Sequence, residues 1–424
     1  MQKHFRRLLW VGCLSAPILG GLGSQAGLGT EASATRAERE LMHSMSGGPM
    51  STHATIDPRA DTTGPVVVDA AGNGYVAWDD PAAGAAADHV LFCRIPAGAT
   101  CTHRVALALP GNSTNSADAI AQPFPVLGGR PGVVYVVGPR YVRGDVVVWA
   151  SRNGGASFSA GAVIPRPSYA GDTGVGDVLR SPTSPSPAVD YFSIASSNDG
   201  LGYSFTGLGS IGAHTPPAGF TFDTSGVPGL VEGATLGFSG QQTVEAFWTD
   251  ADTPPLDYYW SPTSGVSGAQ GSLEHGPIKV ADGINARLAS GPKGLFLLSE
   301  DSSGAAKPLR LDVRRWGPST HTFGAPAFVG LVANDTNATN PGGFGEDAST
   351  GALYVAWPGY GAGGAYVMQL WTSANRGKTF SGPATVADIG DAYQGTTHLA
   401  ATGGHGFLTF TDHRGLQLVD LAHL

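Results

Sequence analysis

The sequence predicts an all-β fold, a seven-bladed β-propeller of four-stranded antiparallel blades, and three observations predict it. A strand that follows a Gly-rich turn, as in Val66–Trp78 (VVVDAAGNGYVAW), recurs in seven copies along the chain. Two turns with the pattern S-x-N-x-G-x-[ST]-F stand at matching places in two of the repeats. The last repeat offers only three candidate strands, and residues 52–57 supply a fourth. Units of four short strands at a period of a few tens of residues are typical of propellers.

Each repeat is expected to form one blade. Besides Val66–Trp78, the recurring second strand is found at Val133–Val137, Gly202–Phe205, Val244–Trp248, Gly294–Leu298, Ala352–Trp357 and Gly406–Phe410. The predicted blades are 61–110, 118–166, 185–232, 233–280, 285–331, 340–388 and 395–424. Residues 165–187 and 206–228 are rich in Pro, Ser and Gly and are expected to be long loops. Residues 52–57 are expected to pair with 416–421, because closure removes exposed sheet edges.

The two matching turns, 151–158 and 373–380, are expected to be structural. Asn-Gly and Arg-Gly steps between apolar runs indicate tight hairpins, because Gly and Asn tolerate positive φ. The Asn side chain and the flanking hydroxyls can hydrogen-bond the backbone of the turn, and the Phe anchors the next strand. The matching residues are Ser151, Asn153, Gly155, Ser157 and Phe158 in the first turn and Ser373, Asn375, Gly377, Thr379 and Phe380 in the second.

Composition and charge exclude several classes of protein. The chain has 63 Gly, 30 Pro and only 13% charged residues, which is typical of a turn-rich β protein. A net charge of −9 gives no electrostatic footprint for nucleic acid or for an anionic membrane. Arg outnumbers Lys, and Gly and Ala are abundant, which favours a bacterial source. We expect a monomer with no cofactor.

The N-terminal residues predict export. Residues 1–34 resemble a signal peptide, with a basic start, an apolar run from Leu8 to about Leu22 and an Ala32-Ser33-Ala34 cleavage site. Residues 35–51 form a polar leader, and 52–424 form the propeller. No later segment is long and apolar enough for a transmembrane helix. The mature protein is expected to be secreted and extracellular.

Two cysteines remain after the predicted signal, Cys93 and Cys101, with a turn-like insert between them. In an oxidising compartment, two cysteines at hairpin spacing predict a disulfide. Free thiols are the alternative. Two cysteines alone do not make a zinc site.

The paired turns resemble the Asp-box of sialidase-like (BNR-repeat) propellers, with Asn153 and Asn375 in the Asp position. The resemblance covers most of the mature chain as an architecture, but only these two turns match well. It implies that the turns connect third and fourth strands on the face opposite the active site. Asn153 and Asn375 are therefore expected to be scaffold residues.

The resemblance also implies a clamp of three arginines for a sugar carboxylate, which this sequence does not supply. Arg94-Ile95-Pro96 has the letters of the family's Arg-Ile-Pro motif, but it stands in the turn between third and fourth strands, on the scaffold face. Thr63-Gly64-Pro65 and Pro123-Phe124-Pro125 open blades without an arginine. Arg140 is better placed, but a single arginine does not make the bidentate clamp.

Polar and aromatic residues gather in the loops after the second strands, at the expected mouth of the channel. These candidate ligand residues are Asp79, Asp80, Arg140, Tyr141, Asp250, Asp252, Glu300, Asp301, Tyr360, Asp412, His413 and Arg414. A pair of carboxylates would act as acid and base on a glycosidic bond. Several carboxylates would alternatively hold Ca²⁺. Exposed Asp in turns is also ordinary, as is a half-exposed loop Tyr.

Three functions therefore stay open. The first is an exported propeller that binds an extracellular ligand, with glycan as the favoured hypothesis, at its acidic channel mouth without classical sialidase catalysis. The second is a diverged glycoside hydrolase of the sialidase-like type that uses channel carboxylates. The third is an extracellular protein-interaction scaffold. An aromatic platform at the mouth favours the first, and a carboxylate pair favours the second.

Overall fold

The computed structural model describes residues 53–60, 64–80, 90–115, 118–120, 122–140, 143, 145–164, 173–180, 187–193, 201–205, 219–222, 231–249, 255–262, 275–301, 309–332, 342–361, 364–390 and 397–421. All of them belong to the unit Gly47–Leu424. The predicted signal peptide and leader, together with Tyr141, Asp250 and Asp252, lie outside the described residues.

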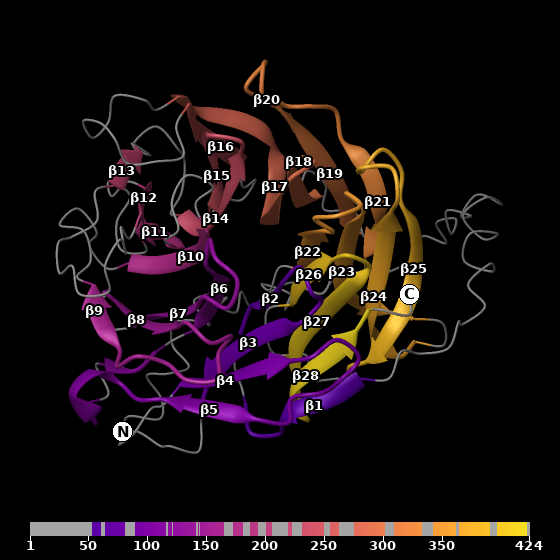
Figure 1. Cartoon of the computed structure of the whole chain (residues 1–424). Coiled ribbons are helices and arrows are strands. Elements are labelled where there is room, and N and C mark those ends of the chain that lie inside the picture. Colours follow the sequence, from indigo (N-terminus) through magenta and orange to yellow (C-terminus); the bar gives the residue numbers. More distant parts are fainter. Residues whose placement is uncertain are drawn as a thin grey trace, which may run out of the picture. The chain divides into compact units, whose positions relative to one another are not determined.

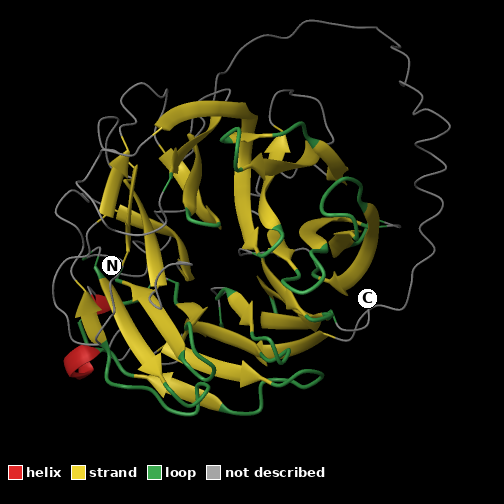
Figure 2. Cartoon of the chain, turned by 45° about the horizontal axis from the view of Figure 1, so that its top comes forward, coloured by secondary structure: helices red, strands yellow, loops and turns green. Residues whose placement is uncertain are grey.

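The described chain is all-β, as the sequence predicts. Its regular elements are strands in antiparallel sheets, with a 3-10 helix at Pro110–Asn112 (Figure 2). The first sheet contains β2 (Val66–Val68), β3 (Gly74–Asp79), β4 (Val90–Ile95) and β5 (Arg104–Leu107). The second contains β6 (Phe124–Leu127), β7 (Val134–Pro139), β8 (Val146–Ser151) and β9 (Ala162–Ile164). The third contains β10 (Thr173–Arg180), β11 (Pro187–Ser193), β12 (Leu201–Phe205) and β13 (Gly219–Phe222).

The remaining strands follow in the same order along the chain (Figure 1). An eight-stranded sheet contains β14 (Val231–Ser239), β15 (Gln242–Thr249), β16 (Pro255–Ser261), β17 (His275–Gly291), β18 (Gly294–Asp301), β19 (Leu309–Gly317), β20 (Thr322–Phe323) and β21 (Ala327–Val332). The next sheet contains β22 (Gly343–Glu346), β23 (Leu353–Tyr360), β24 (Tyr366–Ser373) and β25 (Ser381–Asp388). The last contains β26 (His398–Thr402), β27 (His405–Asp412), β28 (Gly415–Asp420) and β1 (His53–Asp57).

The eight-stranded sheet arises because β17 serves two hairpins. Its first half pairs with β16 and its second half, from Gly283, pairs with β18. The sequence prediction placed a blade boundary between 280 and 285, inside this strand. The pairing with β16 ends at Asp282 and the pairing with β18 begins at Gly283, so the change of partner falls within the predicted interval. The strand itself continues across this point, and the two groups β14–β17 and β17–β21 therefore share it.

The third sheet corrects the predicted strand order. Gly202–Phe205 is the core of β12, the third strand of its sheet, and not a second strand. The sheet begins with β10, in a segment where the sequence predicted a loop, so the predicted boundaries 185–232 are wrong. Thr173–Arg180 reads TGVGDVLR, with two glycines and an aspartate. Its low intrinsic β propensity hides a strand that is fixed by pairing with β11.

The predicted pairing of the N-terminal strand with the last repeat is confirmed. β1 runs antiparallel to β28, with His53 opposite Val419 and Ala54 opposite Leu418. The Thr55 hydroxyl donates to Oε1 of Gln417 at 3.0 Å, across 362 residues of sequence. Contacts also link β2 to β6, β6 to β10, β10 to β14, β14 to β17, β17 to β22, β22 to β26, and β26 to β2.

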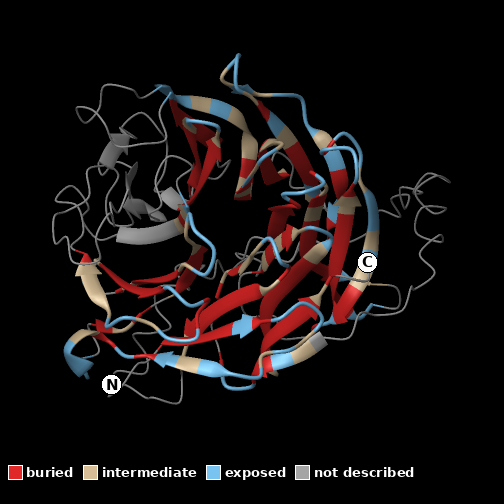
Figure 3. Ribbon diagram, in the orientation of Figure 1, coloured by how far each residue is buried: buried red, intermediate tan, exposed pale blue. Residues whose placement is uncertain are grey.

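The core lies between neighbouring sheets (Figure 3). Phe92 of β4 and Trp149 of β8 belong to one buried cluster, although they come from the first and second sheets. In another cluster, Trp357 and Trp371 of the sheet β22–β25 pack against residues of β18 and β19. Burying such a side chain contributes roughly 1.5–3 kcal/mol, so packing between sheets is the main source of stability here.

The two matching turns have the same hydrogen bonds. The amide of Gly155 donates to the Ser151 hydroxyl at 2.9 Å, and Asn153 binds the Ser157 amide and hydroxyl at 3.0 and 2.8 Å. Ser373, Asn375, Gly377 and Thr379 repeat these bonds with distances within 0.1 Å. A Cβ at Gly155 would lie 2.3 Å from the Phe92 ring, so the turn seats its glycine against the preceding sheet. The predicted turn structure is confirmed.

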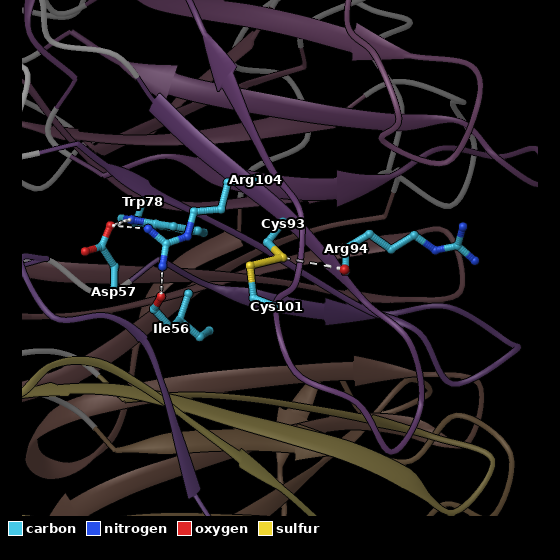
Figure 4. The surroundings of a disulfide bond; sticks show 7 residues. All are labelled: Ile56, Asp57, Trp78, Cys93, Arg94, Cys101 and Arg104. Atoms are coloured by element: carbon cyan, nitrogen blue, oxygen red, sulfur yellow. Dashed lines mark hydrogen bonds and ion pairs between the residues drawn. A yellow bond between two sulfur atoms is a disulfide. The ribbon is translucent and has the colours of Figure 1, made fainter.

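The predicted disulfide between Cys93 and Cys101 is present (Figure 4). It lies close to the contacts that hold the end of β1. Asp57, at the end of β1, is fully buried and accepts hydrogen bonds from the Trp78 indole at 3.1 Å and from Arg104 at 3.3 Å. The Arg104 guanidinium also donates to the Ile56 carbonyl. A carboxylate, an indole and a guanidinium therefore join the last sheet to the first.

Candidate functional site

Each sheet has two ends that differ in their connections. We call the end where a second strand passes to a third the mouth end, and the end with the hairpins between first and second strands the turn end. The described candidate residues all lie at the mouth end: Asp79 at the end of β3 and Asp80 after it, Arg140 after β7, Glu300 and Asp301 on β18, Tyr360 on β23, Asp412 at the end of β27, and His413 and Arg414 between β27 and β28.

Arg140 is held by carboxylates of its own protein. It is buried and binds Asp118 at 2.7 Å and both oxygens of Asp145. Arg143 adds a second cation on Asp118 at 2.6 Å. Asp118 and Asp145 were missed from the sequence, although both flank Arg140 in the loops on either side. An arginine with its donors committed in this way is a structural ion-pair centre.

The hairpin between β27 and β28 closes on itself in the same manner. The backbone N–H of Arg414 donates to Asp412 at 2.7 Å, and its guanidinium binds the other oxygen of that carboxylate at 2.5 and 2.9 Å. The guanidinium also donates to the carbonyl of Asp388. Asp80 lies 3.7 Å from Arg59. The mouth end is therefore lined by paired charges, which reduces the acidity expected from the sequence.

Glu300 differs from these residues because an amide, not a cation, contacts its carboxyl. It is buried, and Nδ2 of Asn285 donates to its Oε2 at 3.0 Å. Its ladder partner Leu311 and its neighbour Leu298 belong to an apolar cluster. Burial raises the pKa of Glu300 from 4.5 to about 7, against the opposing effect of the Asn285 hydrogen bond. A carboxyl of this kind is protonated for part of the time at neutral pH.

Asn285 was also missed from the sequence. It is buried, has a φ of 52° and stands where the ladder between β17 and β18 shifts register. Bulges often redirect a side chain next to a functional site. No sequence motif marks this position, because the bulge is a property of the pairing.

Tyr360 presents an aromatic ring at the mouth end. Its side chain is 56% exposed, and its ring packs against that of Tyr366 with 5.2 Å between the centroids. The Tyr360 carbonyl accepts a hydrogen bond from Gln369 at 3.2 Å, which holds the end of the hairpin. The two rings form an aromatic surface on β23 and β24.

Within the described ranges, no three His, Cys, Asp or Glu side chains gather as a metal site. The described part of the chain also contains no helix long and apolar enough to cross a bilayer.

No family model matches the sequence, and no curated protein matches it significantly. Among solved structures, the chain is similar to the Hadza microbial sialidase Hz136, with 10% identity, a TM-score of 0.45, and coverage of 85% of this chain and 65% of that one. A PL25 ulvan lyase shows 11% identity, a TM-score of 0.48 and coverage of 86% and 95%. The BP39L lectin from Burkholderia pseudomallei shows 14% identity, a TM-score of 0.44 and coverage of 86% and 97%. At these identities and TM-scores, the likeness to each of them concerns the fold alone.

Proposed function

We propose that the chain is an exported bacterial β-propeller of seven blades that binds a glycan at its mouth end. The blade count follows if β14–β17 and β17–β21 are two blades that share a strand and if β1 completes the last one. The observation that carries the binding function is the exposed Tyr360 packed on Tyr366. An aromatic face whose backbone is fixed by a hairpin can stack on a sugar ring with little loss of side-chain entropy.

Binding without sialidase catalysis is favoured by the state of Arg140. A sialidase clamp needs arginines whose donors are available to the sugar carboxylate. Arg140 has its donors on Asp118 and Asp145, so its release would leave the half-buried Asp145 without this cation and the buried Asp118 with Arg143 alone. The proposed ligand is therefore a glycan held by stacking and hydrogen bonds.

A glycan-array screen of residues 35–424, with and without Ca²⁺, tests this function. We expect specific binding that Tyr360→Ala weakens by about tenfold, because the stacking surface is lost, with no change in melting temperature. Phe328→Ala is the matched control, since Phe328 is 45% exposed but lies on the outer strand β21. A flat array in both conditions would exclude glycan binding and favour the protein-interaction scaffold. Calcium-dependent binding would support the Ca²⁺ alternative.

Glu300 favours a second candidate function, a diverged glycoside hydrolase. Its raised pKa suits a general acid that protonates a leaving group. The sugar bound on the array is therefore tested for cleavage, with Asp80, Glu300 and Asp412 replaced in turn. Cleavage that Glu300→Gln abolishes while binding persists would establish catalysis, and binding without cleavage would leave the lectin function.

The proposed export and oligomeric state need separate measurements. The Cys93–Cys101 disulfide supports an oxidising compartment. N-terminal sequencing of protein from the culture medium tests cleavage after residue 34, and light scattering tests the monomer.

A further inference from the structure

A small pocket lies at the turn end, away from the candidate glycan site. It has a volume of about 220 Å³ and is lined by the hairpin turns of two neighbouring groups of strands and by the end of β19. The lining residues used below are Ser239, Gly240, Gly291, Lys293, Gly294 and Arg315. We call this set the basic pocket.

Two of these residues carry positive charge, and a third cation is close. Lys293 is half-buried and Arg315 is exposed, so both reach solvent. Lys293, Arg315 and Arg376 all act electrostatically on one carboxyl, that of Glu346. The lining of the pocket therefore contains two cations and no carboxyl group, in a protein whose net charge is −9. Elsewhere, the described arginines at the mouth end are matched by carboxylates.

Hydrogen bonds within the protein hold the pocket in shape. Gln242 accepts from the Trp316 indole at 2.9 Å and donates to the Pro318 carbonyl at 2.9 Å, which fixes two further lining residues. Arg315 donates to the Lys293 carbonyl at 3.3 Å, and its guanidinium lies 5.8 Å from the centre of the Phe296 ring. Groups that are already positioned bind an ion with a smaller loss of conformational entropy.

Glu346 stands behind the wall of the pocket. Its carboxyl lies so close to Gly291 that a Cβ there would be 2.1 Å from Oε2, so any larger residue would displace the carboxyl. Oε1 accepts the backbone N–H of Lys293 at 3.2 Å, whereas the buried Oε2 has no hydrogen-bond partner among the described residues. Burial raises the pKa of Glu346 to about 7, although the Lys293 amide and the charges of Lys293, Arg315 and Arg376 oppose the shift.

We propose that the basic pocket binds an oxyanion group, such as the sulfate, phosphate or carboxylate of a free ion or of an acidic polysaccharide. Lys293 and Arg315 supply the charge, and the glycine-rich turns let the backbone approach the anion. This site lies at the end of the strands opposite to Tyr360 and does not depend on the proposed glycan site.

Calorimetric titration of sodium sulfate into residues 35–424 at low ionic strength tests the proposal. We expect millimolar binding that Lys293→Gln and Arg315→Gln each weaken by about fivefold or more. Lys378→Gln is the matched control, because Lys378 is exposed in the 373–380 turn at the same end but does not line the pocket. This control should change the affinity by less than twofold. Circular dichroism melts confirm that each variant is folded.

The pH dependence of sulfate binding is a second test, because fixed surface charge alone would not produce it. Sulfate stays doubly ionised between about pH 6 and pH 8, whereas Glu346 becomes neutral as the pH falls through about 7. Binding should therefore be several-fold tighter at the lower pH. Glu346→Gln should remove the difference and give the tight affinity at both pH values.

Dextran sulfate and neutral dextran distinguish the sources of the anion. Tighter binding of dextran sulfate than of free sulfate, lost in the two pocket variants, assigns the pocket to a polysaccharide. Equal affinities per sulfate group assign it to a free ion. The absence of sulfate binding by the wild type, or an equal loss in Lys378→Gln, would overturn the proposal.

Discussion

The mouth end and the turn end of the sheets stabilise buried charges in different ways. At the mouth end, side chains neutralise one another, as Arg140 does with Asp118 and Asp145. At the turn end, backbone N–H groups stabilise the buried charge. Asp347 accepts from the amides of Ser349, Thr350, Gly403 and Gly404. A side-chain network can be altered one residue at a time, whereas backbone donors stay as long as the turns keep their shape.

Each end also contains one buried acid that is not stabilised in its charged form in this way. Glu300 and Glu346 both have a pKa of about 7, and burial is the main cause in both. Glu300 has an amide partner, whereas Glu346 has three cations within electrostatic reach. The same pKa therefore arises in a mostly apolar setting and in a basic one, and the surroundings decide what each acid can do.

The largest expected effect breaks the side-chain network at the mouth end. Arg140→Met should destabilise the protein by about 3 kcal/mol, because the buried Asp118 and the half-buried Asp145 lose their shared cation. Urea unfolding at neutral pH measures the loss. The control is Arg143→Met, whose side chain is 46% exposed and also binds Asp118. It should cost below about 1 kcal/mol, and equal costs would contradict the central role of Arg140.

The next effect is the pH dependence of stability that Glu300 causes at the mouth end. The pKa of Glu300 is raised from 4.5 to about 7, so its stabilising contribution is complete below about pH 4.5 and is lost as the pH rises through 7. The loss amounts to about 3 kcal/mol. Glu300→Gln should therefore make stability less dependent on pH and raise it at about pH 8. Unfolding curves at about pH 5 and pH 8 measure this, and an unchanged slope would contradict it.

The smallest effect tests the backbone network at the turn end. The Ser349 hydroxyl and the amides of Gly404, Thr350 and Ser349 outweigh burial and lower the pKa of Asp347 from 3.8 to about 2. Its contribution, about 2 kcal/mol, is present above about pH 4 and is lost as the pH falls through 2. Asp347→Asn should remove that stabilisation at neutral pH. Asp388→Asn is the control, because exposed Asp388 binds the single amide of Gly390 in its turn.

Much of the fold could be predicted because its signals are local. The turn at 151–158 and the strand ending in Trp78 are written in consecutive residues, and so is the spacing of Cys93 and Cys101. The structure departs from the prediction where pairing overrides local preference. β10 is such a case, and so is β17, where the turn-like step Asp282-Gly283 lies inside a continuous strand.

The candidate site was less predictable for the same reason. Residue order places Arg140 and Glu300 at the mouth end. It does not reveal that Asp118 and Asp145 bind Arg140, or that Asn285 donates a hydrogen bond to Glu300. Those partners come from other loops and from a bulge. The basic pocket was missed altogether, because Lys293 and Arg315 are 22 residues apart and meet only through the pairing of β18 with β19.

The pairing of β1 with β28 has a consequence for the order of events in synthesis. β1 completes a sheet whose other members are made much later, because 362 residues separate Thr55 from its partner Gln417. During that time the edge of β1 is open to wrong partners. Contacts of such long sequence separation also slow folding. A chain with this pairing therefore gains from whatever keeps β1 unpaired until β28 is available.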